Sequence, residues 1–238
     1  MIARQAGRLS LATLRWNRVG AIWALDFCFP PAPIDARFPC VLAVRDLASG
    51  AQLLALPCPD REAHRIVTAL DHLFAIYGAP LVLKTDNEFD SVRLGAFLDQ
   101  NRVIHLLSPP QFPRYNGAVE AGIGSLKTYT FYEAAKHGHA REWSSNDLEA
   151  GRLRANELAR PYGFSGPSPE ECWNTHHPIP EEDRAAFQAA VQKRQSTARR
   201  RLGLLPIIPL GRRERRAVQR SAIALALVDQ GLLHSFVI

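Results

Sequence analysis

The sequence predicts an α/β protein in which a sheet is flanked by helices. Short apolar runs of strand length alternate with amphipathic runs of helix length, in the order strand, strand, strand, helix, strand, helix, strand, helix. The chain has 238 residues, of which 47% are hydrophobic, so it can form a substantial core. We therefore expect one α/β core, with a change of composition beyond about residue 180.

The first predicted strand, residues 22–29, carries an acid inside an apolar run. Because side chains alternate along a strand, Asp26 shares its face with the small Ala24 and Cys28, and four larger apolar side chains lie on the other face. An ionised carboxylate in such a run is costly to desolvate unless a cation or a fixed hydrogen-bond donor compensates it. Asp26 is therefore a candidate functional residue.

The next elements follow from apolar periodicity and turn residues. Residues 39–44 and 51–56 are predicted strands that continue an antiparallel meander. Asp60 is placed to cap a helix whose apolar residues repeat at i, i+3, i+4 and i+7 as far as Tyr77. The remaining predicted elements of the core are a strand over 81–85 that ends at Asp86, a helix around 94–98 and a strand over 103–107.

A further helix carries Glu120. Residues 108–117 contain three prolines and are predicted to be irregular, so they lead into a helix that is capped at or near Asn116. Glu120 lies in the first turns of this helix, on a face separate from its packing stripe, and Lys127 lies on the same face as Glu120, about 10 Å along the axis. Beyond it we predict helices over 148–159, 185–201 and from 215 onward, and a strand or tail over 232–238.

Charge is distributed unevenly around the net charge of +6. Residues 1–20 contain four arginines and no acid, and residues 184–220 contain eleven Lys or Arg and one acid, whereas residues 21–183 contain fourteen basic and twenty-one acidic residues. An acidic centre between basic flanks suits a protein that meets a polyanion through cations at its site. The alternative is that the 184–220 run is a solvated basic helix.

The three acids suit a hard divalent cation with oxygen ligands. Two Asp and one Glu favour Mg²⁺ or Mn²⁺, and a pair of such ions would support in-line phosphoryl displacement. Zinc is disfavoured, because the histidine pairs at 137/139 and 176/177 have no cysteine or carboxylate at ligand spacing. The four cysteines show no paired metal spacing and are expected to be reduced thiols.

Three motifs together resemble the catalytic core of DDE integrases and insertion-sequence transposases. They are Trp23-x-x-Asp26, Lys84-Thr-Asp86-Asn and Ser108-Pro-Pro…Asn116-Gly-x-x-Glu120-x₆-Lys127. Asn156 and the segment Ser168-Pro-Glu-Glu-Cys-Trp173 are similar to the family's region just beyond the core, so the resemblance covers about residues 21–175. Each motif alone is common, and an isolated strand-end Asp is more often a turn or helix cap, but the ordered set is specific.

The resemblance implies a ribonuclease H-like fold, with a mixed five-stranded sheet flanked by helices and a basic, mostly helical C-terminal extension. It implies that Asp26, Asp86 and Glu120 are catalytic residues that bind Mg²⁺ or Mn²⁺ as two ions. The implied activity is metal-dependent DNA cleavage followed by strand transfer at the same site. The predicted DNA contacts are Lys127, Arg114, Asn116, Arg194, Arg199, Arg200, Arg201, Arg212 and Arg213.

Two other functions stay open at this point. A ribonuclease H-like nuclease that only hydrolyses would use the same carboxylates, and a degenerate transposase would bind DNA without cutting it. Lys127 and the 108–117 segment favour the transposase, and the intact acids disfavour the degenerate form. A serine or cysteine nucleophile is not supported, since neither residue occurs in a nucleophile-elbow context.

The chain departs from the family pattern in two respects. Thirty-three residues separate Asp86 from Glu120, slightly fewer than in the retroviral type. Gly122 and Gly124 stand in the helix after Glu120, where each weakens it by roughly 1 kcal/mol relative to alanine; we expect close approach of DNA or another helix there.

The predicted organisation is a basic N-terminal segment over 1–20, a catalytic core over 21–175 and a basic C-terminal extension over 176–238. The first segment is too short for a helix-turn-helix module, so we expect a separate N-terminal DNA-recognition module or protein, or a truncated chain. The expected partners are DNA, both element ends and target duplex, and further copies of this chain on that DNA. No membrane span or signal peptide is predicted, which indicates a cytoplasmic location, associated with the bacterial nucleoid.

Overall fold

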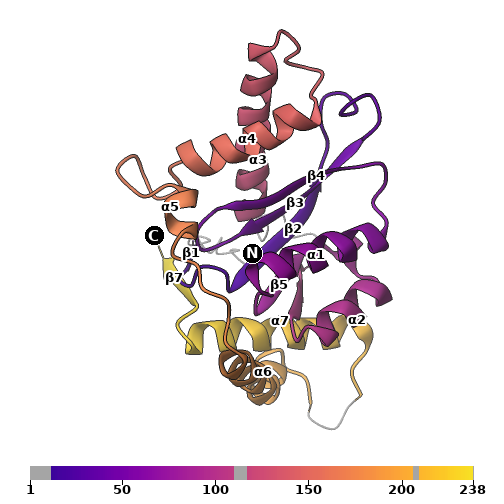
Figure 1. Ribbon diagram of the computed structural model, residues 1–238. Helices are drawn as coiled ribbons and strands as arrows, with labels where there is room; N and C mark the ends of the chain where they lie inside the picture. Colours follow the sequence, from indigo (N-terminus) through magenta and orange to yellow (C-terminus); the bar gives the residue numbers. More distant parts are fainter. Residues whose placement is uncertain (1–11, 110–116, 206–208, 238) are drawn as a thin grey trace, which may run out of the picture.

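A mixed five-stranded sheet forms the centre of the protein (Figure 1). The computed structural model describes residues 12–109, 117–205 and 209–237. The strand order is β4-β3-β2-β5-β6; β2, β3 and β4 form the predicted antiparallel meander, and β5 and β6 run parallel to β2. The strands are β2 (Ile22–Cys28), β3 (Cys40–Asp46), β4 (Gln52–Cys58), β5 (Val82–Thr85) and β6 (Ile104–Leu107). The predicted α/β fold with a mixed five-stranded sheet is confirmed.

The helices are those predicted from the sequence, in the same order, together with two short helices at 87–89 and 169–173 that are not predicted. They are α1 (Ala63–Tyr77), the 3₁₀ helix η1 (Asn87–Phe89), α2 (Val92–Gln100), α3 (Gly117–Lys136), α4 (Ser145–Leu158), α5 (Pro169–Trp173), α6 (Glu181–Arg201) and α7 (Arg212–Asp229). The prediction that Asp60 caps α1 is wrong in position, because the N-cap residue is Glu62. Asp60 instead accepts hydrogen bonds from the Glu62 amide (3.0 Å) and from Arg65 (2.8 Å), which fixes the chain just before the helix.

The two faces of the sheet are covered by different helices. Trp23, Leu25 and Phe27 of β2 face a cluster that includes buried residues of α1 and α2. The intervening β2 residues Ala24 and Cys28 belong to clusters on the opposite face. There α3 and α4 pack over β2, β3 and β4, and α6 and α7 pack over β2, β5 and β6. The alternation predicted for β2 is therefore confirmed, with Asp26 on the α3 side.

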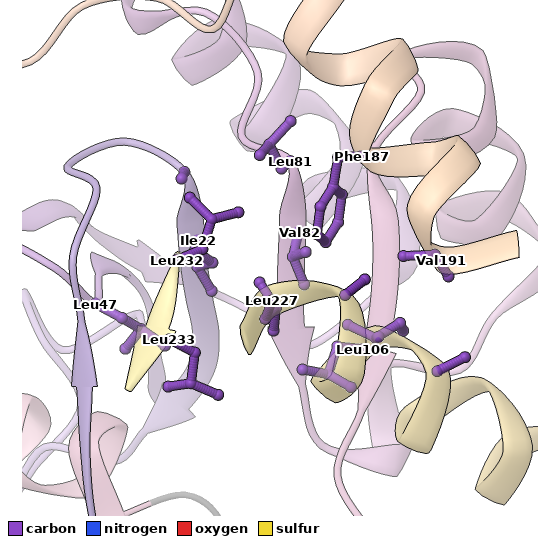
Figure 2. Packing of buried hydrophobic residues seen from close by; sticks show 14 of the residues in the cluster. Ile22, Leu47, Leu81, Val82, Leu106, Phe187, Val191, Leu227, Leu232 and Leu233 are labelled. Carbon is purple, nitrogen blue, oxygen red and sulfur yellow. The ribbon is translucent and has the colours of Figure 1, made fainter. Parts of the chain in front are cut away.

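The helices α6 and α7 share a hydrophobic core with the sheet (Figure 2). Phe187 and Val191 of α6 and Leu227 of α7 lie against Val82 and Leu106 of the two parallel strands. Both helices are predicted from the sequence, but their apolar stripes do not indicate which surface they cover. The structure shows that this C-terminal region covers one half of a sheet face.

Arg184 fixes the start of α6 to the loop after α1. Its guanidinium donates hydrogen bonds to the carbonyls of Pro80 and Ala79, each at 2.7 Å. Burial lowers the pKa of Arg184, and the positive charge of Arg102 lowers it further. This first arginine of the basic 184–220 run is therefore a structural residue that contacts backbone carbonyls.

A second, two-stranded sheet joins the two ends of the described chain. β1 (Ala12–Trp16) pairs antiparallel with β7 (Leu233–Val237), so that Trp16 lies opposite Leu233. The Asn17 side chain supports the pair with a hydrogen bond to the Gly231 carbonyl at 2.6 Å. β7 agrees with the predicted strand or tail, whereas β1 is not predicted, because its partner lies more than two hundred residues away in the sequence.

The short helix α5 explains part of the segment that follows the core. Ser168 caps it through a capping box with Glu171. Trp173 at its end packs against Trp23, with ring centroids 6.5 Å apart, and against Tyr77 at 5.3 Å. The Ser168-to-Trp173 motif is therefore a packing element of the core.

Two expectations from composition agree with the structure. The cysteines are free thiols, of which Cys28, Cys40 and Cys58 are buried. Within the described ranges, no helix combines the length and the apolar character that crossing a bilayer requires.

Candidate active site

The first two acids lie side by side at the carboxyl ends of parallel strands. β2 and β5 are paired up to Leu25 and Thr85, and Asp26 and Asp86 are the next residue of each chain. Neighbouring strands lie roughly 4.8 Å apart, and residues at the same register point to the same face. Asp86 occupies the N-cap position of η1, but its side chain makes no capping hydrogen bond there. The helix-cap explanation for this strand-end Asp therefore does not apply.

The backbone around Asp86 is fixed by polar side chains from two strand ends. The Asn87 amide donates to the carbonyl of Ser108 at 2.9 Å, and the Ser108 hydroxyl donates to the carbonyl of Thr85 at 3.1 Å. These bonds join the end of β5 to the chain that follows β6. The serine and asparagine of the two motifs therefore hold the strand ends in register beside Asp86.

The electrostatics of Asp26 report a concentration of negative charge. The pKa of Asp26 is raised to about 6, first by burial and then by the charges of Asp86, Glu88 and Glu120, against the opposing effect of a hydrogen bond from Phe27. That bond, from the Phe27 amide to Oδ1, is 2.7 Å long. A half-buried carboxylate with three acidic neighbours favours a bound cation.

The third acid comes from α3, which covers the same face of the sheet. Val119 and Leu126 of α3 are buried against it, whereas Glu120 is exposed at the start of the helix. Glu120 contributes to the raised pKa of Asp26. Ligand atoms of Asp26, Asp86 and Glu120 do not all come within 4.8 Å of one another, so the structure brings the three acids to one place without closing them into a compact cluster.

A partly buried arginine fixes the first turns of α3. Arg45 of β3 donates to the Ala118 carbonyl at 2.9 Å, and its guanidinium fills the space beside Gly122, where an added Cβ would lie 2.1 Å from Nη1. The side-chain amide of Gln52 donates a hydrogen bond to the Gly122 carbonyl at 2.8 Å. The expected approach of DNA or another helix at Gly122 is therefore wrong, because the Arg45 side chain fills this space; an added Cβ at Gly124 would meet no atom within 4 Å.

Asn156 belongs to the same support. Its side chain accepts a hydrogen bond from the backbone N–H of Gln52 (2.8 Å) and donates one to the backbone carbonyl of Gln52 (3.1 Å). This pair of bonds joins α4 to β4, next to the Gln52 side chain that holds α3. Asn156 therefore supports β4 at Gln52, whose side chain contacts α3.

Lys84 belongs to the motif Lys84-Thr-Asp86-Asn, but the sequence alone does not assign it a role at the site. It lies two residues before Asp86 on β5, so it shares the face of the acids, and its exposed fraction is 4%. Burial lowers the pKa of Lys84 to about 8, against the opposing effect of Asp86, Asp26 and Glu120. The alternation of β5 is the signal that could have identified it.

A cavity of about 1060 Å³ opens beside these residues. Lys84 and Arg45 line it together with Ala118 and Ala121 from the first turns of α3. The opposite wall comes from β1, β7 and the loop that precedes α5. Asp26, Asp86 and Glu120 are not among its lining residues, so the cavity adjoins the acids through Lys84 and the first turns of α3.

The residues predicted to contact DNA lie in different settings. Lys127 is half-buried and lies near Cys28. The pKa of the Cys28 thiol is raised to about 11, mainly by burial, and the charge of Lys127 acts in the opposite direction. Arg114 and Asn116 fall outside the described residues. Among the predicted C-terminal arginines, Arg200, Arg201, Arg212 and Arg213 are exposed.

Three of the predicted C-terminal arginines make intramolecular contacts. Arg194 forms an ion pair with Asp229 at 2.5 Å, which joins α6 to α7. Arg199 donates from Nε to the Leu205 carbonyl at 2.9 Å. Arg212 pairs with Asp90 at 2.7 Å, close to η1 and therefore to Asp86.

Comparisons with known proteins give one kind of match. No protein-family model matches this chain, and no curated protein matches it. Among solved structures, a chain of the simian T-cell lymphotropic virus intasome in complex with PP2A regulatory subunit B56 gamma matches 70% of this chain with a TM-score of 0.59 and 20% identity. This chain spans 59% of that chain.

Isolated catalytic cores match over nearly their whole length. The HTLV-2 integrase catalytic core domain in complex with magnesium, in its trimeric form, matches with a TM-score of 0.54 and 20% identity, over 68% of this chain and 100% of that one. The catalytic core domain of BIV integrase matches with a TM-score of 0.50 and 19% identity, over 65% and 94%. At these identities the likeness concerns the fold. The chain therefore has the fold of a retroviral integrase catalytic core.

Proposed function

We propose that this protein is a DDE-type polynucleotidyl transferase, a transposase or integrase that cleaves DNA strands and joins them to target DNA. The observation that carries the proposal is the placement of Asp26 and Asp86 at adjacent positions of two parallel strands, on the face that α3 covers with Glu120 in its first turns. The integrase-core fold supports the same conclusion. Asp26, Asp86 and Glu120 are the proposed catalytic residues.

The donor set suits Mg²⁺ or Mn²⁺. Asp26, Asp86 and Glu120 offer carboxylate oxygens, which hard divalent cations prefer. The raised pKa of Asp26 supports a cation there, because opposite charge would relieve the repulsion among the acids. A core of similar fold, that of HTLV-2 integrase, was solved with magnesium. When bound, two such ions supply activation of the attacking oxygen and stabilisation of the leaving oxygen in phosphoryl transfer.

The chain's own residues position these carboxylates. Asp26 and Asp86 are held by the sheet, and Glu120 is held by a helix that Arg45 and Gln52 fix to β3 and β4. Lys84 places a buried ammonium beside the acids and limits their net charge. Because Glu120 is exposed, its side chain is free to rotate toward the other two carboxylates.

We propose DNA as the substrate. Lys127, Arg114 and Asn116 would contact it near the site, and the C-terminal arginines would contact its phosphates. Exposed Arg200, Arg201 and Arg213 are the most available of the last group. We also propose that the protein acts as a dimer or larger assembly on DNA, together with a separate N-terminal recognition module. Structures of similar fold were solved as a dimeric form, a trimeric form and an intasome.

The test is nicking and joining of labelled duplex DNA taken from the sequence that flanks the gene, with Mg²⁺ or Mn²⁺. Asp26→Asn, Asp86→Asn and Glu120→Gln should each abolish metal-dependent cleavage and leave the fold and most DNA binding intact, because each removes a metal ligand. Glu170→Gln, at an exposed position of α5, is the matched control.

Each outcome identifies a function. Joined products that all three variants lose support a transposase or integrase. Cleavage without joining indicates a nuclease that only hydrolyses, and salt-sensitive binding without cleavage indicates a degenerate DNA-binding form. Retained cleavage by one variant removes that residue from the site.

A further inference from the structure

A second group of ligand-type side chains lies at the junction between α3 and α4. His137 and His139 directly follow α3, and Asp147 lies in the first turn of α4. Gly138 has a φ of +83°, which turns the chain so that the two imidazole rings stack with centroids 5.7 Å apart. Spacing along the sequence predicts no carboxylate ligand near these histidines, and this prediction is wrong, because folding brings Asp147 to them.

Asp147 is a buried and oriented carboxylate. Its exposed fraction is 1%, and its Oδ2 accepts hydrogen bonds from the amide (2.9 Å) and hydroxyl (2.5 Å) of Ser144, the N-cap residue of α4. Its Oδ1 faces His137, with Nδ1 at 3.0 Å. Burial opposes its ionisation, but the bonds from Ser144 and the nearby histidines hold the pKa of Asp147 below its ordinary value. Hydrogen-bonded carboxylates of this kind are typical of metal ligands.

The spacing of the three side chains suits a tetrahedral cation. One ligand atom from each residue lies within 4.8 Å of the other two, and within the described part of the chain this is the one such group. Zinc bonds to N and O of about 2.1 Å place two tetrahedral ligands roughly 3.4 Å apart. Nδ1 of His137 lies 3.0 Å from Oδ1 of Asp147, and Nδ1 of His139 lies 3.6 Å from Oδ2 of the same carboxylate; both distances are close to this value.

The exposure of the two histidines and the hydrogen bond that His139 makes are also compatible with metal binding. The His137 side chain is 63% exposed and that of His139 is 36% exposed, so an ion and a water ligand can reach both rings. Nδ1 of His139 lies 2.9 Å from the Glu142 carbonyl, and binding would replace that hydrogen bond with a metal bond. Each neutral imidazole would then carry its proton on Nε2.

We propose that His137, His139 and Asp147 form a zinc site that fastens the end of α3 to the start of α4. It differs from the candidate active site in position and in ligand type. Glu120 and His137 lie at opposite ends of α3, roughly 25 Å apart at 1.5 Å per residue. Imidazole and carboxylate ligands with an open position for water suit Zn²⁺, whereas the all-carboxylate site suits Mg²⁺ or Mn²⁺. The zinc would stabilise the hairpin of α3 and α4, which carries Glu120 at its other end.

The experiment measures zinc binding by the full chain, purified without a histidine tag, by equilibrium dialysis against Zn²⁺ with excess Mg²⁺ to occupy the carboxylate site. Wild-type protein should retain about one zinc per chain and should unfold at a higher temperature with zinc than with chelator. His137→Gln and His139→Gln should lose the bound zinc and the increase in unfolding temperature. His72→Gln, at an exposed position of α1, should behave as wild type.

Two further measurements make the result decisive. Cobalt(II), a spectroscopic substitute for zinc, should give the visible absorption of a tetrahedral site in wild-type protein and in Asp26→Asn, and not in His139→Gln. Equal unfolding temperatures of wild type and His139→Gln in chelator would show that the variant folds. The proposal is overturned if wild-type protein retains no zinc, or if both histidine variants retain as much zinc as wild type; the histidines would then only donate hydrogen bonds to Asp147.

Discussion

Asp26 and Lys84 carry opposite charges at the same edge of the sheet, and burial disfavours the charged form of each. Burial raises the pKa of Asp26 to about 6 and lowers that of Lys84 to about 8, so each group is shifted toward its neutral form. The negative charge of Asp26 nevertheless acts on Lys84 and opposes the lowering of its pKa. Such costly groups persist where function requires them, which agrees with an active site at this edge.

His105 provides a test of burial through pH. It lies on β6, with Nε2 2.8 Å from the Thr85 hydroxyl, and burial lowers its pKa from 6.5 to about 4. In that range the unfolded chain binds a proton that the folded chain does not. The contribution of neutral His105 to the free energy of unfolding is therefore fully present above pH 6.5 and is lost as the pH falls toward 4.

We expect His105→Gln to remove on the order of 2 kcal/mol of this pH dependence. The measurement is the free energy of unfolding in urea across the same pH range, for wild type, His105→Gln and the exposed control His72→Gln. The raised pKa values of Asp26 and Asp46 act in the opposite direction, but they are common to all three proteins and cancel in the difference. An unchanged pH dependence in His105→Gln would show that the imidazole is not held neutral by burial.

At the scale of elements, α3 is the helix that decides the geometry of the site. It delivers Glu120 from its first turn, and its packing is set by Arg45 beside Gly122 and by Thr130 beside Gly151 of α4. The absence of a side chain at Gly122 and Gly151 lets these groups approach the helix backbone. Gly122 and Gly124 of α3 thus differ: Gly122 is required by packing, and Gly124 is not.

We expect Gly122→Ala to destabilise the protein by about 1–3 kcal/mol, because the new methyl group displaces Arg45 from the Ala118 carbonyl. Metal-dependent cleavage should fall as well, since the first turn that carries Glu120 shifts. Gly124→Ala in the same helix is the matched control and should stabilise by up to about 1 kcal/mol. Urea unfolding and the nicking assay measure both effects; equal stability of the two variants would contradict the assigned role of Arg45.

At the scale of the whole molecule, the C-terminal helices complete the core of the sheet. Phe187 is 1% exposed and lies in one cluster with Leu81, Val82 and Leu106 (Figure 2). β7 then returns to pair with β1, so that both ends of the described chain meet in one small sheet (Figure 1). The sheet and the C-terminal helices should therefore unfold together.

We expect Phe187→Ala to lower the free energy of unfolding by about 3–5 kcal/mol while the protein keeps a single unfolding transition. Tryptophan fluorescence, dominated by the sheet side of the core, and circular dichroism, dominated by the helices, should report the same midpoint. Separate midpoints for the two signals would show that α6 and α7 unfold independently of the sheet.

The exposed arginines should make DNA binding depend on salt. Replacing both Arg200 and Arg201 with Gln should reduce the slope of log K against log salt concentration by about 2, because each contact with a phosphate releases a counterion. The same change at Arg93, an exposed position of α2 on the opposite side of the sheet, should leave the slope unchanged. Equal slopes for all proteins would remove α6 from the DNA-binding surface.

The sequence by itself determines the order of strands and helices and the order of the three acids. Apolar periodicity is local, so it predicts β2 with Asp26 on its open face, the strand that ends at Asp86 and the helix of Glu120. Together with the resemblance to integrases, these predict the mixed five-stranded sheet, which the structure has. The basic helices at the C-terminal end are likewise apparent from composition and periodicity.

Only the tertiary structure decides the contacts between residues that are far apart in the sequence. It places Arg45 against Gly122, α6 and α7 against the parallel strands, β1 beside β7 and Asp147 beside His137 and His139. The sequence does not predict these contacts, because each depends on which surfaces remain to be covered after the local elements have formed. Burial also follows from that packing, and burial is what shifts the pKa values of Asp26 and Lys84.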